Sequence, residues 1–113
     1  MSFQAKNEVI RGCTIENVEY RDAYEHLTFD IHNEKGEKLE TVQVCNREIH
    51  QDLRLLLAHP GGRLFWAYGM SDIDVWREDE DSFAIEVSPY DGVYTTYIVN
   101  KSELKKLLNE GEE

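Results

Sequence analysis

Apolar and polar residues alternate along much of the chain, which is typical of half-buried β-strands. In the first half, 9–15 is rich in β-branched residues, 27–31 alternates strictly, and 39–44 follows the turn at 33–36. The strands 27–31 and 39–44 are predicted to form a hairpin around this short turn. The second half contains further strand-like segments, separated by turn residues at 78–81 and 89–92, and these segments are 64–70, 73–76, 83–87 and 93–99.

Two helices are predicted, one after each group of strands. The first begins near Asn46, whose side chain is suited to capping free N–H groups, and ends at the Pro-Gly-Gly of 60–62. The second begins at Asn100 or Ser102. Apolar residues at helical spacing mark the buried sides, namely Ile49, Leu53, Leu56 and Leu57 in the first helix and Leu104, Leu107 and Leu108 in the second.

The two halves of the chain also align with each other at a constant offset. Tyr20-Arg21-Asp22 falls on Trp76-Arg77-Glu78, and the turn residue Gly36 falls on Gly92. Any two amphipathic hairpins share an alternation, so the aromatic-arginine-acid triplet and the glycine are the informative matches. Self-similarity at a fixed period indicates an internal repeat.

The predicted fold is therefore a single α+β domain over 1–113. Two copies of a strand-strand-strand-helix unit, about 7–60 and 61–110, are expected to be related by a pseudo-twofold axis. Each copy alone would have a poor ratio of core to surface, so the copies should bury their apolar faces together. The expected architecture is an antiparallel sheet with two helices packed on it.

Composition and charge narrow the class of protein. The chain has 113 residues, of which 41% are hydrophobic, and a net charge of −11. The start of the chain lacks the apolar run of a signal peptide and no segment is apolar enough to span a membrane, so a cytoplasmic protein is expected. Cys13 and Cys45 lie far apart and are expected to be free thiols without a disulfide.

No catalytic or cofactor motif is recognisable, so neither an enzyme nor a bound cofactor is predicted. Cys45 and His50 suggest a thiol–imidazole pair, but no third residue is evident to orient them. On the polar side of the strand 27–31, Asp30 and His32 are weak candidates for metal ligands, with His26 nearby. A zinc site needs further ligands that the sequence does not place, so no metal is expected.

Aromatic residues are concentrated in the second half, which holds eight of the 12. Successive strand residues face opposite sides, so these rings cannot all be buried on one face. Aromatic residues with a charged rim are the usual composition of a protein interface. The predicted partner-binding residues are Asp72, Asp74, Trp76, Glu78, Asp79, Glu80, Asp81, Trp66, Tyr90 and Tyr94.

The strong negative charge disfavours direct binding to nucleic acid or anionic membranes and favours a basic partner. The leading hypothesis is a small acidic protein-binding inhibitor, of the immunity, antitoxin or anti-defence type, that engages a basic or nucleic-acid-binding protein. One alternative is a small-molecule-binding protein or enzyme with a pocket between the two repeats, lined by Trp66, Trp76 and Tyr97. Another alternative is a structural module that forms a homodimer.

Overall fold

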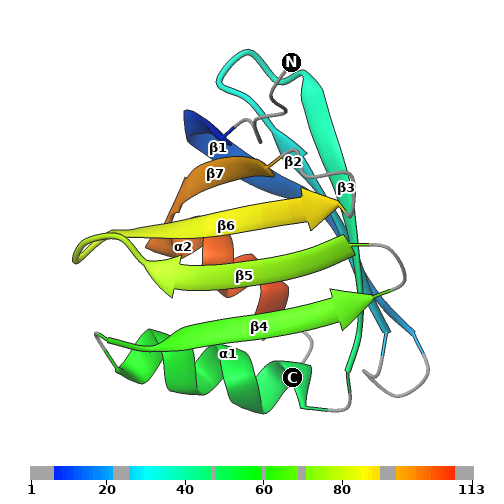
Figure 1. Cartoon of the computed structure of the whole chain (residues 1–113), viewed down its shortest axis with the longest axis vertical. Coiled ribbons are helices and arrows are strands. Elements are labelled where there is room, and N and C mark those ends of the chain that lie inside the picture. Colours follow the sequence, from blue (N-terminus) through cyan, green and yellow to red (C-terminus); the bar gives the residue numbers. More distant parts are fainter. Residues whose placement is uncertain are drawn as a thin grey trace, which may run out of the picture.

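Seven strands form one sheet in the computed structural model, which describes residues 7–21, 26–46, 48–59, 61–68, 71–89 and 94–108. The order across the sheet is β3-β2-β1-β7-β6-β5-β4 (Figure 1). The strands are β1 (Asn7–Arg21), β2 (His26–His32), β3 (Lys38–Cys45), β4 (Arg63–Tyr68), β5 (Ser71–Arg77), β6 (Ser82–Pro89) and β7 (Tyr94–Asn100). The helices are α1 (Ile49–Ala58), α2 (Lys101–Lys105) and the short 3₁₀ turn η1 (Lys106–Leu108).

The long strand β1 joins the two halves of the sheet. Its residues 7–13 pair with β7 in parallel, whereas residues 14–21 pair with β2 in antiparallel orientation. Both pairings contain a register shift, and Gly12 and Asn17 have positive φ values of 72° and 55°. Bulges of this kind bend a strand and increase its twist. The sheet consequently curls into a half-barrel instead of lying flat.

A side chain at Gly12 would meet both a steric clash and an unfavourable backbone conformation. A Cβ atom added there would lie 2.5 Å from Oε2 of Glu34, and the positive φ disfavours any side chain. Glycine therefore allows the β2–β3 turn to pack closely against the bend in β1.

The core lies on the concave side of the curl, where the helices also lie. Figure 1 shows α1 running alongside the edge strand β4, and α2 behind β5 and β6. Covering an edge strand with a helix blocks its unpaired backbone groups. The helices bury Ile49, Leu53, Leu56, Leu104, Leu107 and Leu108 against inward-facing strand residues such as Phe29, Trp66, Phe83 and Ile85.

Beyond the end of β7, side chains of α2 and η1 provide the hydrogen-bond partners for the backbone of β1. The Ile15 N–H donates to Oε1 of Glu103 at 2.9 Å, and Lys106 Nζ donates to the Ile15 carbonyl at 3.2 Å. Glu103 and Lys106 also form an ion pair at 2.8 Å. The backbone groups of Ile15 would otherwise lack a ladder partner on this side, so α2 and η1 replace the missing strand residue.

The α+β prediction is wrong, because strands make up most of the described chain and the helices are only ten and five residues long. The helices fill the curl of a bent sheet, whereas two helices layered on an antiparallel sheet were expected. The sheet is also mixed, since β1 and β7 are parallel. The local apolar spacing indicated where helices form, but it does not contain the bends in β1 that curl the sheet.

The predicted internal duplication with a pseudo-twofold axis is also wrong. The halves meet through β1 and β7, which are not equivalent strands of the proposed repeat, and their parallel pairing is incompatible with a twofold axis between them. Tyr20 lies opposite Leu27 and its hydroxyl donates to the Leu107 carbonyl inside the curl. Trp76, its supposed counterpart, lies on the opposite face beside Arg63. The matching triplets therefore do not have equivalent environments.

The strand and helix positions are otherwise close to the predicted segments. The predicted capping of α1 is displaced, because Oδ1 of Asn46 accepts from the Glu48 N–H at 2.7 Å before the helix begins at Ile49. Asn100 does precede α2, but its side chain makes no capping hydrogen bond. The predicted turn at 89–92 lies mostly outside the described residues. Among the helices that are described, none is long and apolar enough to cross a membrane.

Candidate functional site

The convex side of strands β4 to β7, together with the start of β1, is here called the outer face. Strand alternation and the ladder register place on it Arg63, Phe65, Asp72, Asp74, Trp76, Ala84, Glu86, Ser88, Tyr94, Thr96, Ile98 and Val9. Two rows cross the strands: Arg63, Trp76, Ala84 and Ile98 in one, and Phe65, Asp74, Glu86, Thr96 and Val9 in the other.

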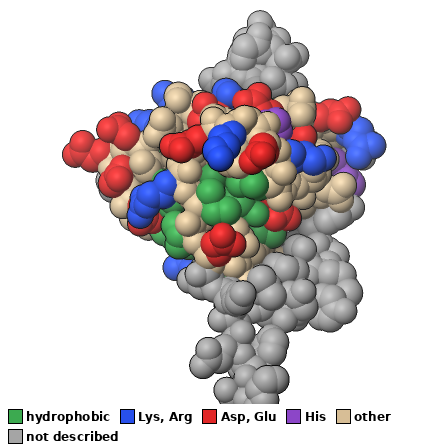
Figure 2. Space-filling model, turned by 90° about the horizontal axis from the view of Figure 1, so that it is seen from above, with side chains coloured by type: hydrophobic (Ala, Val, Ile, Leu, Met, Phe, Trp, Pro, Cys, Tyr) green, Lys and Arg blue, Asp and Glu red, His purple; other side chains and the backbone are tan. Residues whose placement is uncertain are grey.

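The large exposed hydrophobic residues of the outer face lie at its margins. Phe65 on β4 is 62% exposed, Val9 on β1 is 51% exposed, and Tyr94 on β7 is 36% exposed. Ala84 and Ile98, nearer the middle, are buried. A separate view from above, perpendicular to that of Figure 1, shows a hydrophobic patch among acidic and basic side chains (Figure 2). Isolated exposed hydrophobic residues are ordinary, and Phe65, Tyr94 and Val9 lie on β4, β7 and β1, at opposite margins of the face.

Arg63 organises the polar part of the outer face. Its Nε and Nη2 donate to the two carboxylate oxygens of Asp74, each at 2.8 Å, and these hydrogen bonds raise the pKa of Arg63. Its guanidinium carbon also lies 5.2 Å from the ring centre of Trp76. Asp74 lies directly opposite Glu86 on β6, where two like charges repel. Arg63 offsets this repulsion, and the Arg63–Asp74–Glu86 group keeps one net negative charge.

The turn between β5 and β6 is acidic and well ordered by hydrogen bonds. Its four residues, Glu78, Asp79, Glu80 and Asp81, are all exposed. The Glu78 N–H donates to the Ser82 carbonyl at 2.9 Å, and the Asp81 N–H donates to Oδ1 of Asp79 at 2.9 Å. Nε1 of Trp76 donates to Oε1 of Glu78 at 3.2 Å. The turn is thus connected directly to Trp76 on the outer face.

Arg77 anchors the same turn from inside. Its Nη2 donates to the carbonyl of Leu57 near the end of α1 at 2.9 Å, and its guanidinium carbon lies 5.2 Å from the ring centre of Phe83. A cation at this position satisfies a terminal carbonyl of the helix. A hollow of about 650 Å³ opens between Arg77 and the four acidic turn residues.

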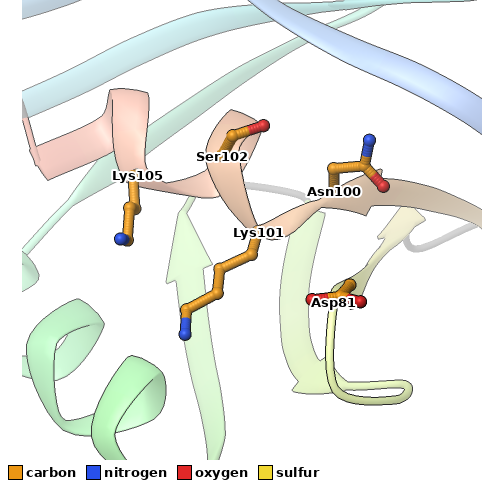
Figure 3. Close-up of a pocket in the computed structure, with 5 residues that line it drawn as sticks. All are labelled: Asp81, Asn100, Lys101, Ser102 and Lys105. Atoms are coloured by element: carbon orange, nitrogen blue, oxygen red, sulfur yellow. The ribbon is translucent and has the colours of Figure 1, made fainter.

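Two lysines border the acidic turn on its other side. Lys101 and Lys105 line a hollow of about 540 Å³ with Asp81, Asn100 and Ser102. Figure 3 shows both lysine side chains extending to the same side of α2. The Lys101 N–H also donates to the Asp81 carbonyl at 2.7 Å, which attaches the turn to α2. The acidic surface is therefore bounded by positive charge on this side.

The structure groups most, but not all, of the predicted partner-binding residues. Asp72, Asp74, Trp76 and Tyr94 lie on the outer face, and the turn 78–81 adjoins them. Trp66 is 2% exposed and belongs to the core, where its Nε1 lies 3.4 Å from Oδ2 of Asp52. Tyr90 lies outside the described residues. Phe65 and Val9 were not among the predicted site residues, although strand alternation already placed Phe65 and Trp66 on opposite faces of the sheet.

Of the two weak metal candidates, Asp30 has hydrogen-bond partners of its own. Asp30 accepts hydrogen bonds from Asn17 Nδ2 and Thr41 Oγ1, each at 2.8 Å, and these bonds lower its pKa. His32 lies two residues away on the same strand face. Within the described ranges, no group of three or more histidine, cysteine, aspartate or glutamate residues is arranged to hold a metal ion.

The histidine beside Cys45 is not His50, which the sequence suggested. Cys45 lies beside His26, with Sγ and Nε2 3.4 Å apart. His50 instead packs edge-on against Tyr20, with ring centres 5.0 Å apart. Neither cysteine forms a disulfide.

Comparison with known proteins does not identify a family. No family model matches the chain, and no curated protein or solved structure is detectably similar to it. The function is therefore inferred from the surface and its chemistry.

Proposed function

We propose that this chain is a binding protein whose outer face engages a basic partner protein. The observation that carries the proposal is the exposed ring of Phe65 near the half-buried Trp76, flanked by the acidic turn 78–81. Tyr94 and Val9 add exposed apolar side chains at the other margin of the outer face, and Asp72 adds a further exposed carboxylate.

The size of the outer face suits a small interface. From β4 to β1 there are five neighbouring strands, which span about 20 Å at the usual strand spacing. From Asp72 to Glu78 the face extends about 20 Å along the strands at the usual rise. Such a surface corresponds to the small end of specific protein interfaces.

The composition of the face supports a protein partner. Aromatic residues supply large rigid contact areas, and Trp and Tyr are enriched among the residues that dominate binding energy. Trp76 is held by Arg63 on one side and Glu78 on the other, so little side-chain entropy remains to be lost on binding.

The charge of the chain supports a basic partner. A net charge of −11 repels anions and speeds encounter with cationic proteins. The carboxylates of the turn can imitate the phosphates that a nucleic-acid-binding protein contacts. An acidic inhibitor of such a protein, of the immunity, antitoxin or anti-defence type, is the class that combines these features.

The test compares matched variants in pull-downs from lysate of the source cell. Phe65→Ser removes the most exposed ring of the outer face, and Leu55→Ser removes a similarly exposed apolar side chain from α1. We expect one basic protein to bind the wild type and Leu55→Ser but not Phe65→Ser. Equal retention by Phe65→Ser and the wild type would contradict the assignment of this face.

A second variant tests the electrostatic part with the partner so identified. Changing Asp79→Asn, Glu80→Gln and Asp81→Asn together removes three charges without changing side-chain size. Association should become slower and less dependent on salt, because long-range attraction acts mainly on the on-rate. An on-rate equal to that of the wild type at low salt would refute a steering role for the turn.

A groove between α1 and β4 favours a second candidate function, the binding of a small apolar molecule. It encloses about 490 Å³ and is lined by Asp52, Leu55, Leu56, His59, Gly61, Gly62, Arg63 and Leu64. The pocket expected from the sequence lay between two repeats and was lined by Trp66, Trp76 and Tyr97, none of which lines this groove. Ligand-induced thermal stabilisation that Leu55→Glu abolishes would support this candidate.

A further inference from the structure

The exposed thiol of Cys45 has an imidazole beside it, at the β3 edge of the sheet. Cys45 is the last residue of β3 and lies directly opposite His26, the first residue of β2. Its Sγ lies 3.4 Å from Nε2 of His26, and the cysteine is exposed. On the other side of His26, the ladder places Arg21 of β1. A thiol, an imidazole and a guanidinium-bearing residue therefore share one row of the sheet, with Arg21 two strands from Cys45.

Cys13 provides the contrast within the same chain. It is 3% exposed, and its Sγ contacts the Ile10 carbonyl at 3.4 Å. Burial raises the pKa of its thiol, and the nearby Glu34 carboxylate contributes in the same direction. Cysteines in such surroundings are unreactive, whereas exposed thiols near cationic groups are the reactive ones.

We propose that Cys45 is a nucleophilic thiol that forms mixed disulfides with low-molecular-weight disulfides such as glutathione disulfide, with His26 as its base. This role is independent of the partner-binding function proposed for the outer face.

The exchange is balanced without any further reactant. His26 Nε2 takes the thiol proton, and the Cys45 thiolate attacks one sulfur of the disulfide. The new bond joins Cys45 to that sulfur, the old sulfur–sulfur bond breaks, and the other half leaves as a thiolate. The leaving thiolate receives the proton from His26, so one disulfide and one thiol become a mixed disulfide and a free thiol.

The sheet holds the pair in place before reaction. Residues directly opposite in a ladder project to the same side, so His26 and Cys45 remain neighbours as long as β2 and β3 are paired. The next row on the same face, Thr28 opposite Gln43, continues the pairing. A nucleophile within hydrogen-bonding reach of its base is the arrangement that activates thiols.

The first experiment measures thiol modification in the folded protein with dithiodipyridine, an uncharged disulfide, by the absorbance of the released thione. We expect one fast equivalent, its loss in Cys45→Ser, and a reaction about tenfold slower in His26→Gln, below the ~100-fold or more of a typical catalytic base. His32→Gln, on the same face of the same strand, is the matched control and should react as the wild type does.

Each contrary result overturns a defined part of the proposal. A fast equivalent that persists in Cys45→Ser would assign the reactivity elsewhere, and an unchanged rate in His26→Gln would remove the histidine from the mechanism. Intact-protein mass spectrometry after glutathione disulfide treatment should then show a single adduct, mapped to Cys45. An unmodified protein under conditions where dithiodipyridine reacts would refute the proposed class of disulfide.

Discussion

The Glu103 carboxylate serves β1 as a hydrogen-bond partner in place of a β7 residue, and removing this carboxylate tests that role. Glu103→Ala leaves the Ile15 N–H without its partner at the parallel junction, where the wild-type hydrogen bond is 2.9 Å long. The same change removes the ion pair with Lys106, whose ammonium group also binds the Ile15 carbonyl. One substitution therefore weakens both backbone contacts of Ile15.

The expected loss follows from these contacts. A hydrogen bond to a charged group contributes about 1.5–3 kcal/mol. The ion pair adds under about 1 kcal/mol, because the Lys106 side chain is 43% exposed to water. We expect Glu103→Ala to lower the free energy of unfolding by about 2–3 kcal/mol, which is a Tm decrease of about 10 °C for a domain of this size. Glu103→Gln keeps an acceptor oxygen and should cost about 1 kcal/mol.

Urea unfolding followed by circular dichroism, with thermal unfolding alongside, measures both variants. The order wild type, Glu103→Gln, Glu103→Ala tests the hydrogen bond separately from the charge. A loss below about 0.5 kcal/mol for Glu103→Ala, within the range of ordinary surface substitutions, would show that the side chain does not replace a strand partner.

Three further predictions concern other parts of the sheet. Burial, with the hydrogen bond to Glu40, raises the pKa of Tyr97, so its stabilising effect is complete below its unfolded value of about 10 and is lost at higher pH. The stability of Tyr97→Phe should therefore fall less steeply than that of the wild type as the pH rises, as measured by circular dichroism. An unchanged alkaline profile would contradict this. Gly12→Ala should cost about 1–3 kcal/mol in urea unfolding, whereas Gly61→Ala, with no atom near its Cβ, should be close to neutral; equal effects would refute the strain at Gly12. Hydrogen bonds lower the pKa of Asp30, so its contribution is present above about pH 4 and is lost as the carboxylate protonates. Acid titrations of Asp30→Asn should show a smaller decline than the wild type, and identical curves would argue against these bonds.

The positions of the strands were predictable because each one follows a local rule. Phe83, Ile85 and Val87 alternate with smaller or polar residues, and the structure buries all three on one face. The same rule separated Phe65 from Trp66 correctly. It does not determine which of two adjacent aromatic residues faces the core, because that depends on where α1 lies.

The architecture was not predictable because it depends on long-range pairing. Nothing in the local pattern of Asn7 to Cys13 indicates that its neighbour is β7, or that the pairing is parallel. The positive φ values of Gly12 and Asn17 cause bends that hydropathy does not record. The apparent repeat arose because two hairpins share alternation and a turn glycine.

The candidate site was partly predictable for the same reasons. The acidic turn and Trp76 are close in sequence, so their association follows from a single hairpin. The pairing of Arg63 with Asp74 joins two strands, and that of Cys45 with His26 requires the register of another hairpin. The contacts of Arg63 with Asp74 and of His26 with Cys45 were therefore missed, whereas the association of Trp76 with the acidic turn was found.

The pairing of β1 with β7 also has a consequence for synthesis of the protein on the ribosome. β1 emerges long before β7, yet Asn7 can pair only when Tyr94 is available. Until then, β1 to β3 can form a meander whose β1 edge is open to other chains. Contacts between residues so distant in sequence are slow to form. A nascent or truncated chain without β7 would lack the strand that joins β1 to β6, and would be prone to aggregate through that edge.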